Sequence, residues 1–504
     1  MKLQTEVLII GGGATGAGIS RDLSSRGIPC LVIEKGDFSS GASGRNHGLL
    51  HSGGRYVVSD PGTARECIAE NRILRQIAPH CIEETGGFFI SLPEDGLDFR
   101  NQFLQACEKA EIPTTLLSRE ETLDLEPGLN PDLLSAVKVP DGAIDPFTLV
   151  VENAWDAEDL GAKFLLHTEV TSLILNGNII KEALAKDLLY GEEYSIEASY
   201  LINATGAWAN QFLKLVSLHI PMALSKGSML ITNQRLNHRV INRCRKPADG
   251  DIIVPNDTVS ILGTTSVHSE EVENFEVTSS EVSLLIRETS KMIPAINGVR
   301  FIRAYAGIRP LFQSEAKGDD RSISRGFALI DHGKRDGMQN LITIIGGKLV
   351  TYRLMAEKAS DLLCEKMGIK ASCSTHLRPL PNARERTKLK DRLKRVSTGG
   401  EEILCDCELV QREEAEEVLR EGKVKDLKDI LHRTRLAKGT CQGGFCIYRL
   451  LGVLHELRMV EGDSNKILKE FLEERWKGIR PILWGTSLKE EELIESIYKG
   501  IFNL

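Results

Sequence analysis

Residues 6–16 constrain the fold of this chain more than any other stretch. They read Glu-Val-Leu-Ile-Ile-Gly-Gly-Gly-Ala-Thr-Gly, so a short β-branched run of the kind buried in a parallel sheet leads directly into glycines. Gly11, Gly13 and Gly16 fill the pattern G-x-G-x-x-G, in which the first makes the turn, the second admits a pyrophosphate and the third lets a helix pack closely. The stretch predicts a strand, a tight turn and a helix that begins near Ala14 and points its unpaired N–H groups at phosphates.

A second strand is predicted over residues 30–33, and Glu34 follows it about twenty residues after the glycines. A carboxylate at this position binds a ribose hydroxyl and disfavours a 2′-phosphate. Glycine clusters also make ordinary turns. Because a strand precedes these glycines and a helix and an acid follow them, the pattern predicts a dinucleotide site.

Length and charge limit the class of protein. The chain has 504 residues, which exceeds the roughly 250–300 at which one core stops growing, so we expect two or three domains. A net charge of −8 argues against nucleic acid as the main partner. The first strand starts at once and no apolar run approaches the roughly 18 residues of a membrane span, so we expect neither a secretion signal nor an anchor. Eleven cysteines in such a chain indicate a reducing compartment.

Residues 38–56 contain too much glycine, serine and histidine for a core. Small residues let the backbone approach a flat ring, and His47, His51, Arg55 and Tyr56 supply hydrogen-bonding groups within a short stretch. The segment therefore predicts a binding loop, with a plain polar surface loop as the alternative.

Two later strands also end in glycine turns. Residues 200–208 read Tyr-Leu-Ile-Asn-Ala-Thr-Gly-Ala-Trp, and residues 341–348 read Leu-Ile-Thr-Ile-Ile-Gly-Gly-Lys. Such strand ends are where α/β sheets bind ligands, although ordinary connections look alike. After the second strand, a helix N-terminus and Lys348 bring positive charge that suits a reduced flavin. Between residues 168 and 208 we expect strands to keep alternating with helices.

Residues 220–330 contain extended runs separated by turns, which predict a second domain with a mixed or antiparallel sheet. Within residues 303–311, positions 303, 305, 307 and 309 share one face of a strand. Arg303 and Arg309 would be costly together in a core, so we expect this face to meet an anion or solvent.

The C-terminal part is a separate module. A basic linker reaches Arg395 and ends near residues 399–400. Two close cysteine pairs follow, Cys405-x-Cys407 and Cys441-x4-Cys446, and they can place four thiolates around one soft metal centre. A redox-active metal centre that relays single electrons is the functional interpretation, with tetrathiolate zinc or unligated thiols as alternatives.

Three basic residues lie near the second cysteine pair: Arg433, Arg435 and Lys438. They suit two interpretations, one in which they offset the charge of a cluster and one in which they form a solvated basic face.

Several of these motifs, in this order, resemble the FAD-dependent glycerol-3-phosphate dehydrogenases over nearly the whole chain, and more narrowly the catalytic A subunits of the bacterial anaerobic enzyme. The motifs are residues 11–16, 41–53, 139–142, 241–247 and 346–348, and the tail at 474–478 and 484–485. The cysteine spacing looks like the small [2Fe–2S] domain related to bacterioferritin-associated ferredoxin (BFD-like).

This resemblance implies an α/β fold in three parts. An FAD-binding Rossmann-like domain of the DAO/glutathione-reductase type would comprise residues 1–65, 147–217 and 338–370. A mixed-sheet substrate-binding domain would comprise residues 66–146 and 218–337. After a linker at 371–400, a small, mainly helical, cysteine-ligated module would fill residues 401–504.

The resemblance also implies oxidation of sn-glycerol 3-phosphate to dihydroxyacetone phosphate, with the C2 hydride passing to flavin N5. His51 would be the base for the C2 hydroxyl, although a histidine in such a loop can instead bond only the backbone. Arg55 and Arg309 would hold the phosphate or the hydroxyls. Lys348 would lie against flavin and substrate oxygens, and Tyr56 would add a hydroxyl donor.

The implied FAD site takes residues from the glycine turns, the polar loop and the strand ends. They are Gly11, Gly13, Ala14, Thr15, Gly16, Glu34, Lys35, Ser43, Gly44, Arg45, Asn46, His47, Gly48, Val170, Ala204, Thr205, Gly206, Trp208, Gly307, Arg309, Gly346, Gly347, Lys348 and Leu349. The ligands of the [2Fe–2S] cluster, or of zinc as the alternative, would be Cys405, Cys407, Cys441 and Cys446.

By the same resemblance, electrons would leave through further flavin and iron–sulfur subunits to quinone. The chain would then be cytoplasmic and peripheral on the inner face of the cell membrane. Two other functions stay open. One is an amino-acid, amine or 2-hydroxyacid dehydrogenase of the same flavin superfamily, in which the arginines hold a carboxylate. The other is a redox carrier or sensor without a substrate of its own.

Overall fold

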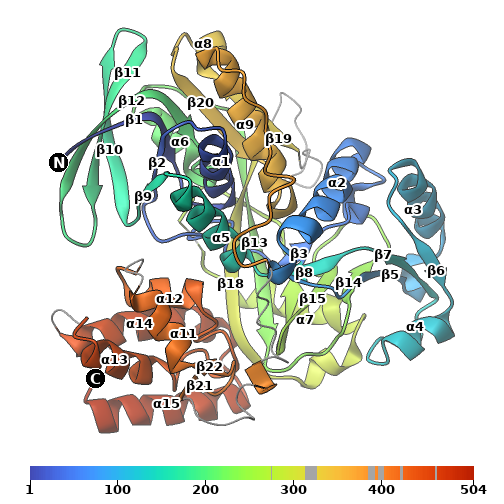
Figure 1. The fold of residues 1–504 in the computed structure, drawn as a ribbon. Coiled ribbons are helices and arrows are strands. Elements are labelled where there is room, and N and C mark those ends of the chain that lie inside the picture. The colour runs from blue at the N-terminus through green and yellow to red at the C-terminus, as the bar shows by residue number, and fades with distance from the viewer. Residues whose placement is uncertain (274, 313–325, 384–391, 395–401, 421–423, 460–462) are drawn as a thin grey trace.

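The structure is a computed structural model that describes residues 1–504 except 274, 313–325, 384–391, 395–401, 421–423 and 460–462. Two large sheets lie next to each other, and a helical C-terminal module packs beside both (Figure 1). Within the described residues, no helix has both the length and the apolar character that a bilayer crossing needs.

The first sheet has eight strands. It runs in the order β10-β11-β12-β1-β2-β9, and β20 pairs with both β12 and β19. The strands are β1 (Lys2–Ile10), β2 (Cys30–Ile33), β9 (Lys163–Leu165), β10 (Thr168–Asn176), β11 (Ile179–Asp187), β12 (Glu193–Asn203), β19 (Phe327–Asp331) and β20 (Leu341–Gly346). Because β2, β1, β12 and β20 run parallel, their carboxyl ends meet at one edge, where the predicted glycine turns lie together.

Three helices cover one face of this sheet: α1 (Ala14–Ser25), α5 (Pro146–Asp159) and α9 (Tyr352–Met367). Ile19 and Leu23 of α1 are fully buried against Val7, Ile9 and Val32, which fixes the helix directly behind the first strand. The short helix α6 (Ala209–Lys214) packs with the apolar side chains of the opposite face. The predicted Rossmann-like α/β domain is confirmed.

The segment after residue 168 differs from the prediction. Instead of strands that alternate with helices, β10, β11 and β12 follow one another as an antiparallel meander. Gly177 and Gly191 adopt left-handed conformations in the two connecting turns, with φ of +59° and +76°, which lets the chain reverse in a few residues.

The second sheet has nine strands in the order β17-β13-β16-β15-β14-β5-β7-β6, and β18 pairs with β13. They are β5 (Gly87–Ser91), β6 (Thr115–Leu117), β7 (Ser135–Val139), β13 (Met222–Thr232), β14 (Val240–Arg243), β15 (Ile252–Asn256), β16 (Val259–Gly263), β17 (Val267–Ser269) and β18 (Phe301–Phe312). Only β14 and β5 pair in parallel among the strand pairs of this described sheet. The expected mixed sheet is therefore confirmed.

Helices and a small sheet complete this part of the molecule. The helices are α2 (Pro61–Ile77), α3 (Asp98–Lys109), α4 (Arg119–Leu125) and α7 (Ser279–Ser290), and the small sheet comprises β3 (Leu49–Leu50), β4 (Ile82–Glu83) and β8 (Gly142–Ile144). The short helix α8 (His332–Arg335) belongs to the first sheet instead, where it connects and contacts β19 and β20. The side chain of Asp60 caps α2 by accepting from Thr63 N, with proline in the first turn. This cap sets where α2 starts, just after the polar loop.

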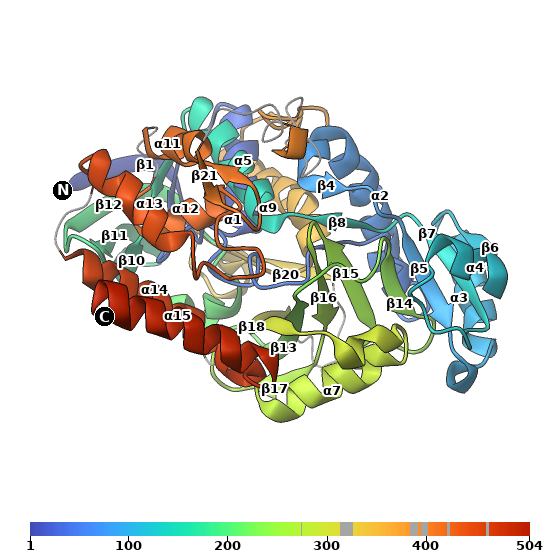
Figure 2. The same ribbon diagram turned by 90° about the horizontal axis from the view of Figure 1, so that it is seen from below.

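The C-terminal module is mainly helical. It contains β21 (Ile403–Cys405), β22 (Val410–Gln411), α11 (Arg412–Arg420), α12 (Leu427–Arg433), α13 (Ile447–Glu456), α14 (Ser464–Ile479) and α15 (Thr486–Phe502) around an apolar core of its own. Figure 2 shows α14 and α15 side by side along the underside of the molecule, and α14 contacts β18 of the second sheet.

The predicted domain limits can be compared with these elements. Strand β19, which falls in the segment predicted to bind substrate, pairs with β20 in the first sheet. Much of the predicted linker 371–400 lies outside the described residues. Its first part packs on α5 of the first domain, where Arg378 pairs with Asp156, and on the end of α2, where Leu380 N donates to Ile77 O.

Candidate functional site

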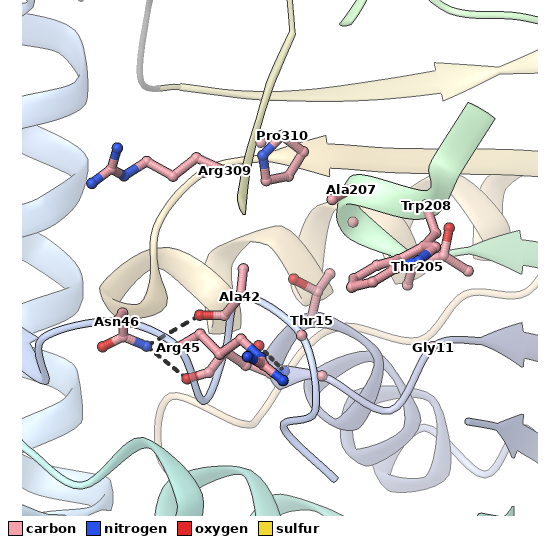
Figure 3. A pocket seen from close by; sticks show the side chains of 18 of the residues that line it. Gly11, Thr15, Ala42, Arg45, Asn46, Thr205, Ala207, Trp208, Arg309 and Pro310 are labelled. Atoms are coloured by element: carbon pink, nitrogen blue, oxygen red, sulfur yellow. Dashed lines mark hydrogen bonds between the residues drawn. The ribbon is translucent and has the colours of Figure 1, made fainter. Parts of the chain in front are cut away.

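A cavity of about 1390 Å³ lies between the two large sheets. Figure 3 shows Gly11 and Thr15 near one end, the loop with Ala42, Arg45 and Asn46 along one wall, and Arg309 on the opposite side. Small-molecule pockets usually measure about 300–1,000 Å³. This cavity therefore has room for a dinucleotide and a second small molecule.

The turn at the N-terminus of α1 requires its glycines. Gly11 has φ of +111°, and a Cβ there would lie 2.6 Å from Ala204 O; a Cβ on Gly16 would lie 1.8 Å from Gly11 O. Gly13 caps α1 without a side-chain hydrogen bond, although Ser43 Oγ accepts from Ala14 N at 2.9 Å. A helix N-terminus with few side-chain caps is suited to bind an anion such as pyrophosphate.

Glu34 stands next to this turn. Its Oε2 accepts from Gly12 N at 2.6 Å and its Oε1 from Gly36 N at 2.8 Å. Burial raises the pKa of Glu34, whereas these two backbone hydrogen bonds oppose the increase. The carboxylate therefore organises the turn as well as lining the cavity.

A polar cluster occupies another part of the cavity wall. The rings of His47 and His51 are 6.0 Å apart, and those of His51 and Tyr56 are 5.5 Å apart. Lys348 Nζ lies 4.5 Å from the centre of the Tyr56 ring. The structure thus brings together residues of the polar loop and of the turn after β20, which are about 300 positions apart in the sequence.

Both histidines are neutral near pH 7. Burial lowers the pKa of His51 well below 6.5, and the nearby His47, Lys348 and Arg55 lower it further. Burial, with Arg309 and Arg55, lowers the pKa of His47 to about 3. A neutral imidazole can accept a proton, so His51 has the protonation state of a general base, although the same lowering of its pKa weakens it as a base.

Two arginines line the same cavity. Arg309 Nη2 donates to Thr264 Oγ1 at 2.7 Å, and its Nη1 donates to Thr265 O at 3.2 Å. Arg55 Nη2 donates to Ala248 O at 3.2 Å and lies 3.7 Å from Asp251 Oδ2. These contacts hold each guanidinium in place before any ligand arrives.

The four positions predicted to share one face of β18 meet different surroundings. A Cβ on Gly478 of α14 would lie 2.9 Å from Arg303 Cγ, so Arg303 packs on the C-terminal module. Tyr305 Oη donates to Asn46 O at 2.9 Å, and a Cβ on Gly307 would lie 2.3 Å from Arg45 O. Among these four, Arg309 alone lines the cavity. This face therefore does not open on a single ligand: its first three positions pack on another module and on the loop, and Arg303 has the carboxylate of Glu474 nearby.

Most of the predicted cofactor residues line the cavity. The exceptions are Gly16, Gly44, Gly48 and Gly307, which lie behind its wall, where the lack of a side chain permits close packing. Thr264, Thr265 and Phe275 also line the cavity but were not predicted from the sequence. The run Thr-Thr-Ser directly after β16 could have indicated the two threonines. Nothing in the sequence marks Phe275, whose ring centre lies 4.0 Å from Arg45 Cζ.

The four cysteines of the module come together. Cys405 interacts with Cys446, and Cys441 interacts with both Cys407 and Cys446. These sulfur contacts lower the pKa of Cys405 and Cys441 and, with burial, raise that of their partners. The four cysteines therefore lie together and contact one another in pairs. Among the described residues, a different group has three candidate ligand atoms that all lie within 4.8 Å of one another: Asp37, His167 and Asp429.

Comparison with known proteins adds to this geometry. Residues 6–353 match the model of the family described as FAD dependent oxidoreductase. The chain is 43% identical to the A subunit of the anaerobic glycerol-3-phosphate dehydrogenase of Escherichia coli, over 99% of this chain and 97% of that protein. It is 40% identical to the A1 subunit of the corresponding enzyme of Haloferax volcanii, over 100% of this chain and 91% of that protein.

Two solved structures share the fold. A glycerol-3-phosphate dehydrogenase from Bacillus halodurans, complexed with FAD, is 20% identical with a TM-score of 0.64, and the match covers 96% of each chain. A glycine oxidase from Geobacillus kaustophilus is 21% identical with a TM-score of 0.59, over 75% of this chain and 98% of the oxidase. At this level of identity the likeness concerns the fold alone.

Proposed function

Because the chain belongs to the FAD dependent oxidoreductases, and among them to the anaerobic glycerol-3-phosphate dehydrogenase A subunits, we propose that it uses FAD to oxidise sn-glycerol 3-phosphate to dihydroxyacetone phosphate. One observation carries this proposal. Arg55, Arg309 and Lys348, which come from distant parts of the sequence, line the same cavity as the glycine turn and the neutral His51.

The residues of the cavity fit FAD. The glycine turn leaves no room for side chains and suits a pyrophosphate, and Glu34 lies where a ribose hydroxyl would bind. His47 Nδ1 and Trp208 Nε1 are buried without hydrogen-bond partners among the described residues, so both have hydrogen-bonding capacity for a ligand. The predicted residues of the polar loop and of the turn at 346–349 would hold the ring. FAD supplies the acceptor for the hydride from C2.

The chain's own residues then divide the remaining work. Neutral His51 takes the proton from the C2 hydroxyl. Arg55 and Arg309 hold the phosphate or the neighbouring hydroxyls, since a guanidinium fork matches phosphate oxygens. Lys348 and Tyr56, which lie against each other, offer donors to the substrate oxygens.

Anaerobic titration of the purified protein with glycerol 3-phosphate tests this function. We expect bleaching of the flavin absorbance at about 450 nm, because reduction of the cofactor reports hydride transfer directly. Bleaching by an amino acid, an amine or a 2-hydroxyacid instead would favour the other dehydrogenase. A flavin that stays oxidised with every polyol phosphate would favour a redox carrier.

We further propose that Cys405, Cys407, Cys441 and Cys446 hold a [2Fe–2S] cluster that relays single electrons. Two observations support this proposal. The four cysteines contact one another in pairs, and their C-x-C and C-x4-C spacing resembles that of the small [2Fe–2S] domain.

Substitution Cys441→Ser is expected to abolish the bound iron and acid-labile sulfide while substrate still bleaches the flavin, because Cys441 contacts two other cysteines of the site. Iron and sulfide analysis measures the effect. Cys373→Ser, outside the module and partly buried, is the matched control and should leave the iron content unchanged. Stoichiometric zinc in the unsubstituted protein would support the alternative instead.

We also propose that electrons continue through flavin and iron–sulfur partner subunits to quinone, with the chain peripheral on the inner face of the cytoplasmic membrane. The support is that the relatives are named as the A or A1 subunit of their enzyme. Copurification of this chain with redox-active subunits and a quinone reductase activity would test the proposal.

A further inference from the structure

The basic residues near the second cysteine pair join the module to the flavin domain. The Arg433 side chain is fully buried and pairs with Asp37 through two contacts of 2.8 Å, Nη1 to Oδ2 and Nη2 to Oδ1. His432 Nδ1 lies 2.6 Å from Asp37 Oδ2, and its ring stacks on Phe147 at 4.8 Å. Lys438 Nζ lies 4.6 Å from the centre of the same Phe147 ring. A solvated basic face, one of the two sequence-based interpretations, is therefore wrong.

Arg435 makes the connection closest to the cysteines. Its Nε donates to Glu408 Oε2 at 2.7 Å, and Glu408 directly follows Cys407. On the other side, Nη1 lies 3.0 Å from Asp257 Oδ2 and Nη2 donates to Asn256 Oδ1 at 3.4 Å. The side chain is only 14% exposed. One guanidinium thus binds the cysteine segment and the turn between β15 and β16 at the same time.

A second contact reinforces this connection. Thr258 Oγ1, in the same turn, donates to Glu408 Oε1 at 2.8 Å. The Glu408 side chain is 1% exposed, so both of its oxygens are used at the boundary between the two modules. Removing either donor would leave a buried carboxylate partly unpaired, which is costly.

The same turn lies next to the cavity. A Cβ on Gly48 would be 3.6 Å from Asn256 Nδ2, and Gly48 follows His47, which lines the cavity. A short series of contacts therefore leads from the cavity wall through residues 47–48, the turn at 256–258 and Glu408 to Cys407.

We propose that Arg435 is a positioning residue that sets the rate of electron transfer from the flavin to the cysteine-held centre, by fixing the Cys407 side of the module against the turn at 256–258. The inference rests on the proposed function. Electron transfer weakens steeply as the distance between donor and acceptor grows, so a loosened contact on this side slows the transfer. The pairing of Asp37 with Arg433 would still hold the module to the flavin domain, so the loss of Arg435 alters the fit without releasing the module.

The test uses the full-length, cofactor-loaded Arg435→Gln variant mixed anaerobically with glycerol 3-phosphate. Flavin bleaching should stay close to the wild-type rate. Loss of this hydrogen bond should favour the loosened contact by about tenfold or more. Reduction of the cluster, followed by electron paramagnetic resonance of rapidly frozen samples, should therefore become slower than in the wild type, because the centre then lies farther from the flavin. Hydrogen exchange of the backbone at residues 427–436 should become faster. Arg420→Gln, an exposed arginine paired with Glu416 on its own helix, should change none of these.

Asp257→Asn weakens the same contact from the side of the second sheet and changes no residue of the cysteine module. If Arg435→Gln lowers the iron content, the Asp257→Asn variant is the one that tests the effect on electron transfer. The inference is overturned if a variant with full iron content reduces its cluster as fast, relative to its flavin, as the wild type does. It is also overturned if both variants lose iron. If substrate fails to bleach the wild-type flavin, the proposed function fails, and photoreduction of the flavin then tests Arg435 separately.

Discussion

Replacing His51 with Gln is expected to lower kcat by about 10²- to 10⁴-fold, the usual contribution of a positioned general base. FAD should remain bound, because the residues that fit the dinucleotide lie elsewhere in the cavity. Steady-state turnover with glycerol 3-phosphate and flavin absorbance measure the two effects. His219→Gln is the matched control, since His219 is exposed and its ring contacts Asn210. A variant that retains more than half of the wild-type kcat would exclude His51 as the base.

The pH dependence of turnover follows from the same histidine. Burial and neighbouring positive charges lower the pKa of His51 well below 6.5, so the neutral, proton-accepting form persists as the pH falls through 6.5. We expect kcat at saturating substrate to hold down to that pH and to decline only below it. Saturation matters because phosphate esters themselves titrate near pH 6. A decline centred at or above pH 6.5 would contradict this protonation state.

Replacing Arg309 with Ala is expected to lower kcat/KM with glycerol 3-phosphate by about 10- to 150-fold or more, because one hydrogen bond to a charged group contributes about 1.5–3 kcal/mol. Most of the loss should appear in KM if the guanidinium binds substrate and transition state alike. The structure supports a large effect, since Thr264 and Thr265 hold the guanidinium at the cavity. Wild-type rates in this variant would count decisively against the proposed function.

Two comparisons sharpen this result. Arg309→Lys keeps the charge but loses the planar fork, so it should recover only part of the activity. Glycerol without its phosphate should be turned over equally poorly by the wild type and by Arg309→Ala if the residue binds the phosphate. An unequal effect on glycerol would assign Arg309 to the hydroxyls instead.

Local patterns predicted the elements that position the cofactor. The apolar run before Gly11, the helix after Gly13 and the strand at 30–33 all depend on neighbours in sequence, and the observed β1, α1 and β2 agree with them. Strand β11 was harder to predict. Its sequence Ile-Ile-Lys-Glu-Ala-Leu-Ala-Lys-Asp is rich in helix formers, yet pairing with β10 and β12 on both sides makes it a strand.

The sequence predicted the individual residues of the cavity, but it did not predict how the C-terminal module packs on the rest of the chain. Glycine context and family resemblance singled out His51, Arg55, Arg309 and Lys348, all of which line the cavity. The contact between Asp37 and Arg433 joins positions 396 apart in the sequence. No local period or spacing encodes such a contact, because it depends on how two separately folded parts meet.

The two ends of strand β18 contact different parts of the molecule. Arg303 packs against helix α14 of the C-terminal module, and Arg309, six residues later on the same face, lines the cavity. Pairing along nearly the whole length of β13 fixes its register. Inserting a single residue at the centre of β18 would turn one end to the opposite face relative to the other. The six-residue spacing along β18 thus fixes the contact with the C-terminal module and the position of Arg309 in the cavity relative to each other. We therefore expect a one-residue insertion between them to disrupt one of the two contacts.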